Sequence, residues 1–248
     1  MPDLAVIMGA TGGLGSAIVD AFASRGDRVI AVARSRAEVS QLASKYPLSA
    51  SPSDGGQGGG VTGDTADLTS RLEVDDLWER IDRVGTPRWV VNATGGYRGG
   101  TVIDSTPDDF TFMMNLNLGT AWWACRAAAR RMQISPSASG GRQGGGCIVN
   151  VSSRSGLVAE PGAAAYAVAK AGVIKLTEVL AAELKASGVR VNVVVPVLID
   201  TPANRQALPE KLMQKAVAPA EIAAVIAYLC SDAETSITGA TIPVYGKY

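Results

Sequence analysis

A short apolar run, a glycine-rich turn and a helical segment follow one another at the start of this chain. Leu4 to Met8 is a continuous apolar run, the pattern of a strand buried on both faces of a parallel sheet. The turn from Gly9 to Gly15 (GATGGLG) follows directly, and apolar residues then recur at helical spacing from Ser16 to Arg25. Such glycines let the backbone approach a pyrophosphate, whose charge then faces the free N–H groups at the helix start. The order of strand, turn and helix therefore predicts the first half of a dinucleotide-binding unit.

Strand and helix patterns alternate along the rest of the chain. This alternation predicts a Rossmann-like α/β fold, a doubly wound parallel sheet with helices on both faces and right-handed crossovers. Ser/Gly-rich stretches at 49–63 and 135–146 are predicted to be flexible surface loops of one domain, residues 1–248, rather than linkers between domains. The further strands are expected at 28–33, within 61–66, and at 88–92, 147–151, 189–195 and 241–244, with helices at 71–84, 106–132, 162–186 and 220–230.

Composition excludes several classes of function. The formal net charge is zero, which gives no electrostatic case for nucleic acid or an anionic membrane. No apolar run approaches the roughly 20 residues of a membrane helix, and no signal peptide precedes the first strand. The three cysteines lie in apolar runs without metal-ligand spacing, as in a reduced cytoplasmic protein. The sequence has no histidine, which excludes Ser-His-Asp and Cys-His catalysis and most zinc sites, so no metal is expected.

The end of the second predicted strand bears on the choice of cofactor. Where NAD-preferring proteins of this fold carry an acid for the ribose diol, this chain has Ala33 followed by Arg34, Ser35 and Arg36. An acid would repel a 2′-phosphate, whereas an arginine can pair with it through two hydrogen bonds. This favours NADP(H), with NAD(H) as a possible second cofactor; a solvated arginine is the alternative interpretation.

A serine, a tyrosine and a lysine are expected to meet at the carboxyl end of the fifth strand. Ser153 follows that strand, and open α/β sheets bind ligands there. Tyr166 and Lys170 are four residues apart, so they share one face of the next helix. A phenol with a pKa of about 10 is a poor acid–base group at neutral pH, and a nearby ammonium is expected to lower that pKa. The three residues predict acid–base chemistry on a carbonyl group.

Two asparagines lie inside the apolar helix predicted at 106–132. A buried asparagine is costly unless it is hydrogen-bonded, so Asn115 or Asn117 is expected to have a structural or catalytic partner.

Taken together, these motifs resemble the short-chain dehydrogenase/reductase family over essentially the whole chain. The matching residues are Gly9-x3-Gly13-x-Gly15, Asp67-Leu68, Asn92-Ala93-Thr94-Gly95, Asn117-Leu118, Ser153, Tyr166-x3-Lys170 and Pro196 to Thr201. The chain departs from the family pattern at Met8, Ala93-Thr94, Val197 and Tyr245-Gly246-Lys247, none of which removes a catalytic group. The segment Ile199 to Pro209 is shorter than the lid of many fatty-acyl-type reductases and is similar to that of dihydropteridine-reductase-like bacterial members.

The resemblance implies a role for each matching residue. Tyr166 is expected to be the acid–base residue, Ser153 to orient the carbonyl, and Lys170 to bind the nicotinamide ribose and tune the tyrosine. Asn117 is preferred over Asn115 as the anchor of a water on a proton relay, because it has the family's spacing. The expected cofactor-binding residues are Gly9, Thr11, Gly12, Gly13, Leu14 and Gly15 at the pyrophosphate, Arg34 and Ser35 after the second strand, Asp67 and Leu68 at the adenine, Asn92, Ala93 and Gly95 along the adenine-side ribose, Tyr166 and Lys170 at the nicotinamide ribose, and Pro196, Ile199 and Thr201, the last two at the carboxamide.

The predicted function is hydride transfer between NADPH and a ketone or aldehyde, reversible as an alcohol dehydrogenase. The alternative is a non-catalytic NADP(H)-binding sensor, which need not keep Ser153, Tyr166 and Lys170 together. Tyr97, Arg98 and Arg205 lie in loops expected to line the substrate pocket, and they suggest a small or medium polar carbonyl compound. By analogy with the family, the chain is expected to form a dimer or tetramer through its two long helices.

Overall fold

A computed structural model describes residues 2–47, 59–133 and 145–247 of the chain. The predicted loop at 135–146 lies almost wholly outside these ranges, and so do residues 49–58 of the other predicted loop. Most of the remainder of that loop belongs to the strand Gly60–Thr65, so the strand predicted within 61–66 is confirmed and the loop ends earlier than predicted.

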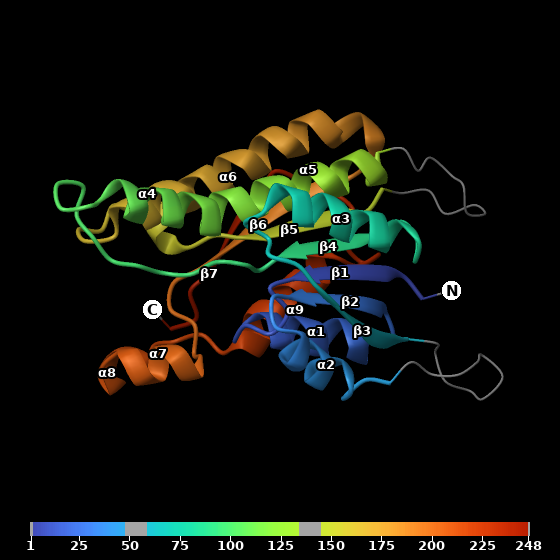
Figure 1. The fold of residues 1–248 in the computed structure, drawn as a ribbon, viewed down its shortest axis with the longest axis horizontal. Helices are drawn as coiled ribbons and strands as arrows, with labels where there is room; N and C mark the ends of the chain where they lie inside the picture. The colour runs from blue at the N-terminus through green and yellow to red at the C-terminus, as the bar shows by residue number, and fades with distance from the viewer. Residues whose placement is uncertain (1, 48–58, 134–144, 248) are drawn as a thin grey trace.

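Within these ranges, seven strands form one parallel sheet in the order β3-β2-β1-β4-β5-β6-β7 (Figure 1). The strand order reverses between β1 and β4, so the chains that leave these two strands diverge and open a crevice at their carboxyl ends. These ends point to the left in Figure 1. The strands are β1 (Leu4–Met8), β2 (Arg28–Ala33), β3 (Gly60–Thr65), β4 (Trp89–Asn92), β5 (Cys147–Val151), β6 (Arg190–Pro196) and β7 (Thr241–Val244).

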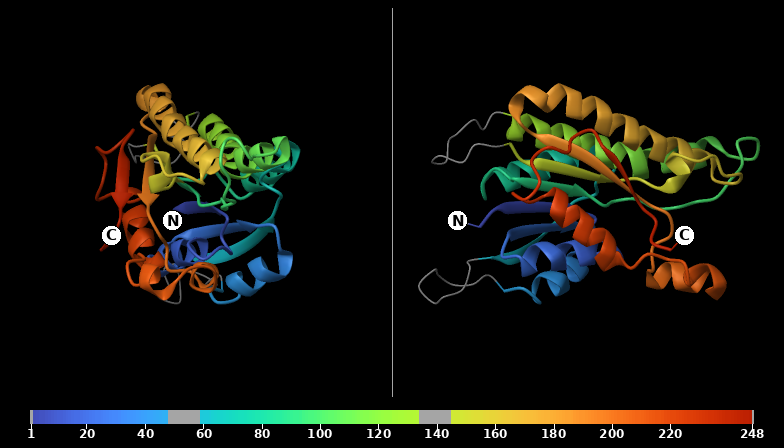
Figure 2. Two further views of the ribbon diagram at one scale, coloured as in Figure 1. Left: turned by 90° about the vertical axis from the view of Figure 1, so that its left-hand side faces the viewer. Right: turned by 180° about the vertical axis from the view of Figure 1, so that it is seen from behind.

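Helices cover both faces of the sheet, as predicted (Figure 2). Because side chains alternate along a strand, Ala5 and Ile7 of β1 pack into one apolar core, while Val6 and Met8 pack into the other. The helices over the first face are α1 (Gly15–Ser24), α2 (Arg36–Ala43) and α9 (Pro219–Leu229), and those over the second are α3 (Arg71–Asp82), α5 (Thr120–Met132) and α6 (Ala164–Leu184).

The long helix predicted at 106–132 is not a uniform α-helix. It consists of α4 (Pro107–Met113), a π-helical segment at Met114–Gly119, and α5. Single π turns within α-helices often mark functional sites, and Asn117 lies in this one. The segment after β6 contains two short helices, α7 (Pro202–Ala207) and α8 (Glu210–Met213). None of the helices in the described ranges has the length and apolar character needed to cross a lipid bilayer.

Candidate active site

The turn after β1 is built so tightly that only glycine fits at several positions. Gly9 has a φ of 78°, and its N–H and that of Ala10 both donate to the carbonyl of Val32 at 2.9 Å. A Cβ on Gly15 would lie 2.0 Å from the Gly9 carbonyl oxygen. A Cβ on Gly13 would lie 2.6 Å from the Thr201 methyl group, so this turn packs directly against the loop after β6. The predicted pyrophosphate and carboxamide segments are therefore neighbours.

A cleft of about 210 Å³ opens beside this turn at the crevice between β1 and β4. Eight of the predicted cofactor residues line it: Gly9, Thr11, Gly12, Arg34, Asp67, Leu68, Ala93 and Gly95. Six further residues, none of them among the predicted cofactor residues, complete the lining: Ala33, Ala66, Thr69, Thr94, Leu116 and Thr120.

The lining of the cleft suits a dinucleotide. Gly9, Gly12 and Gly95 lack side chains, so a ligand can approach the backbone of both the turn after β1 and the loop after β4. These two segments pack closely, since a Cβ on Gly9 would lie 2.9 Å from the Thr94 nitrogen. The Thr94 hydroxyl is buried and has no hydrogen-bond partner among the described residues. A buried hydroxyl without a partner is unfavourable, and a ligand oxygen or a water in the cleft would relieve that cost. Thr94 stands where the family pattern has alanine, and this departure is the feature of the sequence that could have indicated a hydroxyl in the cleft.

Two predicted cofactor residues are engaged elsewhere. The Ser35 side chain accepts a hydrogen bond from the Glu38 N–H at 3.3 Å and so caps α2. The Asn92 amide is buried, donating to the Asn150 side-chain oxygen at 2.7 Å and to the Cys125 sulfur at 3.3 Å. Asn92 thus joins β4 to β5 and α5 beneath the cleft.

Arg34 is an exposed residue of the cleft lining, and its charge acts on Asp67, which lines the cleft as well. The Thr69 hydroxyl and N–H donate to the Asp67 carboxylate at 2.7 and 2.9 Å. These two hydrogen bonds, and then the Arg34 charge, hold the pKa of Asp67 below its usual value. The site therefore presents an ionised carboxylate and a guanidinium side by side.

Ser153 and Tyr166 meet where β5 ends. Ser153 is buried and begins a short 3₁₀ turn, and its side chain is hydrogen-bonded to the Tyr166 hydroxyl. Burial raises the pKa of Tyr166, and the hydrogen bond from Ser153 only partly opposes this. The prediction of a lowered pKa is therefore wrong for this structure, because burial disfavours the charged phenolate.

Lys170 lies beneath the tyrosine, fully within the protein. Its ammonium donates to the Val151 carbonyl at 3.1 Å and lies 5.8 Å from the centre of the Tyr166 ring. Burial lowers the pKa of Lys170 to about 8. The Ser152 hydroxyl, directly after β5, donates to the Lys170 carbonyl at 2.8 Å and so joins α6 to the end of that strand.

Gly95 connects the lysine to the cleft. It lines the cleft, and a Cβ there would lie 3.0 Å from the Lys170 nitrogen and 2.8 Å from the Asn117 side-chain oxygen. Asn117 is buried, whereas Asn115 is exposed. The structure thus brings Asn117 and Lys170 together at the floor of the cleft, and it leaves Asn115 outside.

The other predicted residues surround this centre. Leu14 is buried, and Pro196 ends the buried strand β6. Thr201 caps α7, since its hydroxyl accepts from the Asn204 N–H at 3.2 Å. Within the described ranges, no group of three or more Cys, Asp or Glu side chains is arranged to hold a metal ion.

The chain is similar to known proteins over most of its length, including the residues of this site. Residues 3–212 match the family model described as short chain dehydrogenase. The chain is 31% identical to a 3-oxoacyl-[acyl-carrier-protein] reductase from Thermotoga maritima, with 97% of this chain and 95% of the relative covered. It is 32% identical to a galactitol 2-dehydrogenase from Rhizobium johnstonii, with 97% and 92% covered.

A similar solved structure carries a bound dinucleotide. It is a 3-oxoacyl-[acyl-carrier protein] reductase with bound NAD from Brucella melitensis, 30% identical to this chain with a TM-score of 0.82. The similarity covers 99% of this chain and 90% of that chain.

Proposed function

Because the chain belongs to the short-chain dehydrogenase/reductase family, we propose that it is an NADPH-dependent carbonyl reductase, reversible as an alcohol dehydrogenase. Its relatives are named as reductases and dehydrogenases of carbonyl and hydroxyl compounds, which supports an oxidoreductase acting on such a pair.

One observation carries this proposal. At Gly95 the glycine-lined cleft reaches the buried ammonium of Lys170, one helical turn from Tyr166. A dinucleotide in the cleft would therefore end beside Tyr166 and Ser153. A protein that only sensed the dinucleotide would not need a hydrogen-bonded serine and tyrosine at that end.

Ser153, Tyr166 and Lys170 each have a separate role in the proposed reaction. When bound, the nicotinamide supplies the hydride that adds to the carbonyl carbon. The Ser153 and Tyr166 hydroxyls hold the carbonyl oxygen, and Tyr166 gives it a proton. The raised pKa keeps the phenol protonated, which is the form that reduction requires. The Lys170 charge then stabilises the phenolate that remains, and its ammonium would also hold the ribose hydroxyls.

Asn117 holds the floor of the site. Its amide donates to the carbonyls of Gly96 and Met113 at 3.0 and 3.1 Å. In this proposal, Asn117 fixes the loop after β4 under the cofactor, and a water beside it relays protons to Lys170.

The test is to mix the protein with NADPH and a panel of ketones, alongside Tyr166→Phe. We expect the variant to lose roughly 10²- to 10⁴-fold in rate, the usual contribution of a general acid. Tyr228→Phe is the matched control, because Tyr228 is exposed on α9. Wild-type rates in Tyr166→Phe, or no NADPH oxidation by wild-type protein, would refute the proposal.

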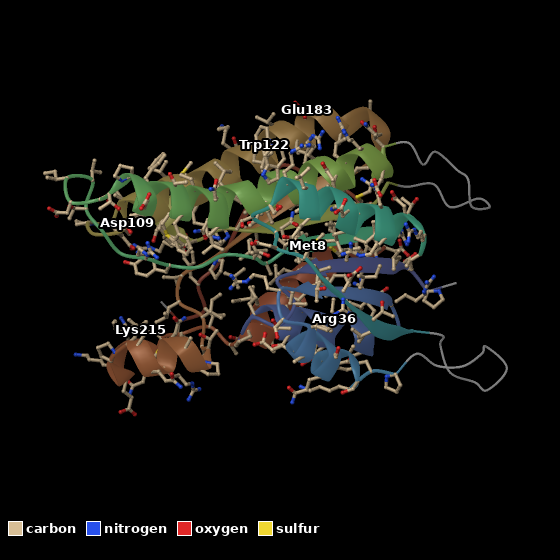
Figure 3. The ribbon with its side chains drawn as sticks, in the orientation of Figure 1. Met8, Arg36, Asp109, Trp122, Glu183 and Lys215 are labelled. Atoms are coloured by element: carbon tan, nitrogen blue, oxygen red, sulfur yellow. The ribbon has the colours of Figure 1, made fainter. Side chains whose placement is uncertain are left out.

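We also propose that the protein acts in the cytoplasm as a homodimer or homotetramer. An apolar groove of about 580 Å³ runs between α5 and α6, and Trp122 and Val179 are about half exposed along it. Trp122 and Glu183 lie on the outer side of this helix layer (Figure 3). A second copy packed on this groove would remove these apolar side chains from water.

A further inference from the structure

We propose that Tyr97 forms one wall of the substrate pocket and selects a carbonyl compound with a flat aromatic group beside the reacting carbon. This inference rests on the proposed function, since it takes Tyr166 as the acid that meets the carbonyl.

Tyr97 contacts the ring of Tyr166 directly. The two ring centres are 5.2 Å apart, and the rings are inclined at 83° to each other, an edge-to-face arrangement. Tyr166 is partly buried, but Tyr97 is 65% exposed. Most of the Tyr97 surface therefore remains available to a molecule that approaches the Tyr166 hydroxyl.

The backbone holds Tyr97 in a set position relative to the acid. Gly100 N–H donates to the Gly162 carbonyl at 2.8 Å, and Ala164 N–H donates to the Gly100 carbonyl at 3.1 Å. These bonds join the loop after β4 to the start of α6, and Tyr166 is the third residue of that helix. The Tyr97 hydroxyl donates to the same Gly162 carbonyl at 3.4 Å. The wall and the acid are thus parts of one connected segment.

The position of Tyr97 favours a flat apolar group over an aliphatic one. An aromatic ring packs against another with an attraction beyond that of burial alone, because the edge of one ring is attracted to the face of another. A substrate carbonyl at the Tyr166 hydroxyl would put its adjacent substituent next to Tyr97. An aryl substituent there can contact the Tyr97 ring as Tyr166 itself does.

The arginines nearest the site already have carboxylate partners. Arg98 contacts Asp109 at 2.7 Å and also stacks on the Phe112 ring, at 4.3 Å from its centre. Arg154 pairs with Glu160. Arg205 pairs with Asp200 at 2.5 Å. Because each of these arginines is paired with a carboxylate, the site favours an uncharged substrate. The sequence predicted a small or medium polar carbonyl compound, and the pairing narrows that prediction to compounds without a charge.

Three ketones and two variants test the inference. The probes are acetophenone, cyclohexyl methyl ketone, which is similar in size but not aromatic, and benzoylformate, an anionic relative of acetophenone. Exposed ion pairs are weak and could open to an anion, so the third probe tests the charge argument. The measurement is kcat/KM with NADPH for wild type, Tyr97→Leu and Tyr97→Phe.

We expect wild type to prefer acetophenone over both other probes. Tyr97→Leu should lower kcat/KM for acetophenone roughly tenfold, as expected for an aromatic contact, and change it far less for cyclohexyl methyl ketone. Tyr97→Phe should restore the preference. Ile103→Ala is the control, because Ile103 lies on the same loop and is 94% exposed.

Equal losses with all three ketones in Tyr97→Leu would assign Tyr97 a merely structural role and overturn the inference. A preference for benzoylformate or for cyclohexyl methyl ketone in wild type would overturn it as well. Wild-type protein that oxidises NADPH with none of the probes or a wider ketone panel would overturn the proposed function itself.

Discussion

Asn117 and Gly96 hydrogen-bond to each other in both directions. The Asn117 amide donates to the Gly96 carbonyl at 3.0 Å, and the Gly96 N–H donates to the Asn117 side-chain oxygen at 3.2 Å. Because Asn117 lies in the π-helical segment, these two bonds join that segment to the loop after β4, and the same amide also donates to the Met113 carbonyl one turn earlier.

Replacing Asn117 with aspartate should disrupt this junction. A carboxylate accepts hydrogen bonds but cannot donate, so the carbonyls of Gly96 and Met113 would lose their donor and face a negative charge. We expect Asn117→Asp to lower the free energy of unfolding by about 1–3 kcal/mol and to weaken dinucleotide binding. Urea unfolding and a fluorescence titration with NADPH measure the two effects.

Asn115→Asp is the matched control. Asn115 is exposed two residues away, so its free energy of unfolding should change by less than about 0.5 kcal/mol. Equal effects of the two substitutions would contradict the assignment of Asn117.

Lys170 should destabilise the protein that lacks its cofactor. Its pKa is lowered from 10.5 to about 8 by burial. Between these values the unfolded chain binds more protons than the folded one, so the wild type gains stability as pH rises from about 8 to 10.5. Below pH 8 the cost of the buried charge is fully present. Removing the charge should therefore stabilise the fold at neutral pH.

The variant Lys170→Met tests whether removing the buried charge raises the free energy of unfolding. We expect its free energy of unfolding at pH 7 to exceed that of wild type by about 2 kcal/mol, after allowing for the lost hydrogen bond to Val151. The difference should shrink by pH 10, and catalysis should be lost. Urea unfolding at both pH values is the measurement, with exposed Lys175→Met as control. A less stable variant at pH 7 would show that the hydrogen bond outweighs burial.

Arg34 should set the preference for NADPH. In Arg34→Asp a second carboxylate would stand beside Asp67 and repel a 2′-phosphate. Losing a charged hydrogen bond costs about 1.5–3 kcal/mol, so the ratio of NADPH to NADH affinity should fall roughly 10- to 100-fold. Arg36→Asp is the control, because the Arg36 guanidinium donates to the Thr65 hydroxyl at 3.0 Å and neither residue lines the cleft. An unchanged ratio in Arg34→Asp would mean that Arg34 is merely solvated.

Trp122 should hold copies of the chain together. Trp122→Glu puts a charge in the apolar groove between α5 and α6, whose lining already includes Glu183. We expect the assembly to dissociate to a smaller species, measured by size-exclusion chromatography with light scattering. Leu72→Glu is the control, since Leu72 is 65% exposed on α3. If neither variant changes the mass, the groove is not the interface.

The sequence predicted the strands well where both faces are buried. Within β1, β2 and β5 nearly every residue is apolar and buried, so the apolar run marks the strand directly. Two residues of β3, Thr62 and Gly63, are exposed, which explains why its pattern is weak. The helix α2 was not predicted, because only Val39 and Leu42 on it are buried. Its signal was present at Ser35, which caps the helix.

The pKa shift of Tyr166 and the local backbone conformation were harder to predict from the sequence than which residues lie together. Spacing placed Tyr166 and Lys170 on one helix face, and they lie together. The direction of the Tyr166 pKa shift depends on how deeply the ring is buried, which spacing does not report. Nor does the sequence reveal the π-helical segment at Met114–Gly119, because that turn depends on backbone hydrogen bonding rather than on residue pattern.

The bridge between Gly100 and Ala163 has an evolutionary consequence. Since it couples the loop that carries Tyr97 to the helix that carries Tyr166, lengthening or shortening this loop would also displace the acid. Relatives of this chain with new substrates should therefore arise more readily by exchanging the side chain at position 97 than by remodelling the loop. Libraries built to retarget the protein would do best to vary that side chain and preserve Gly100.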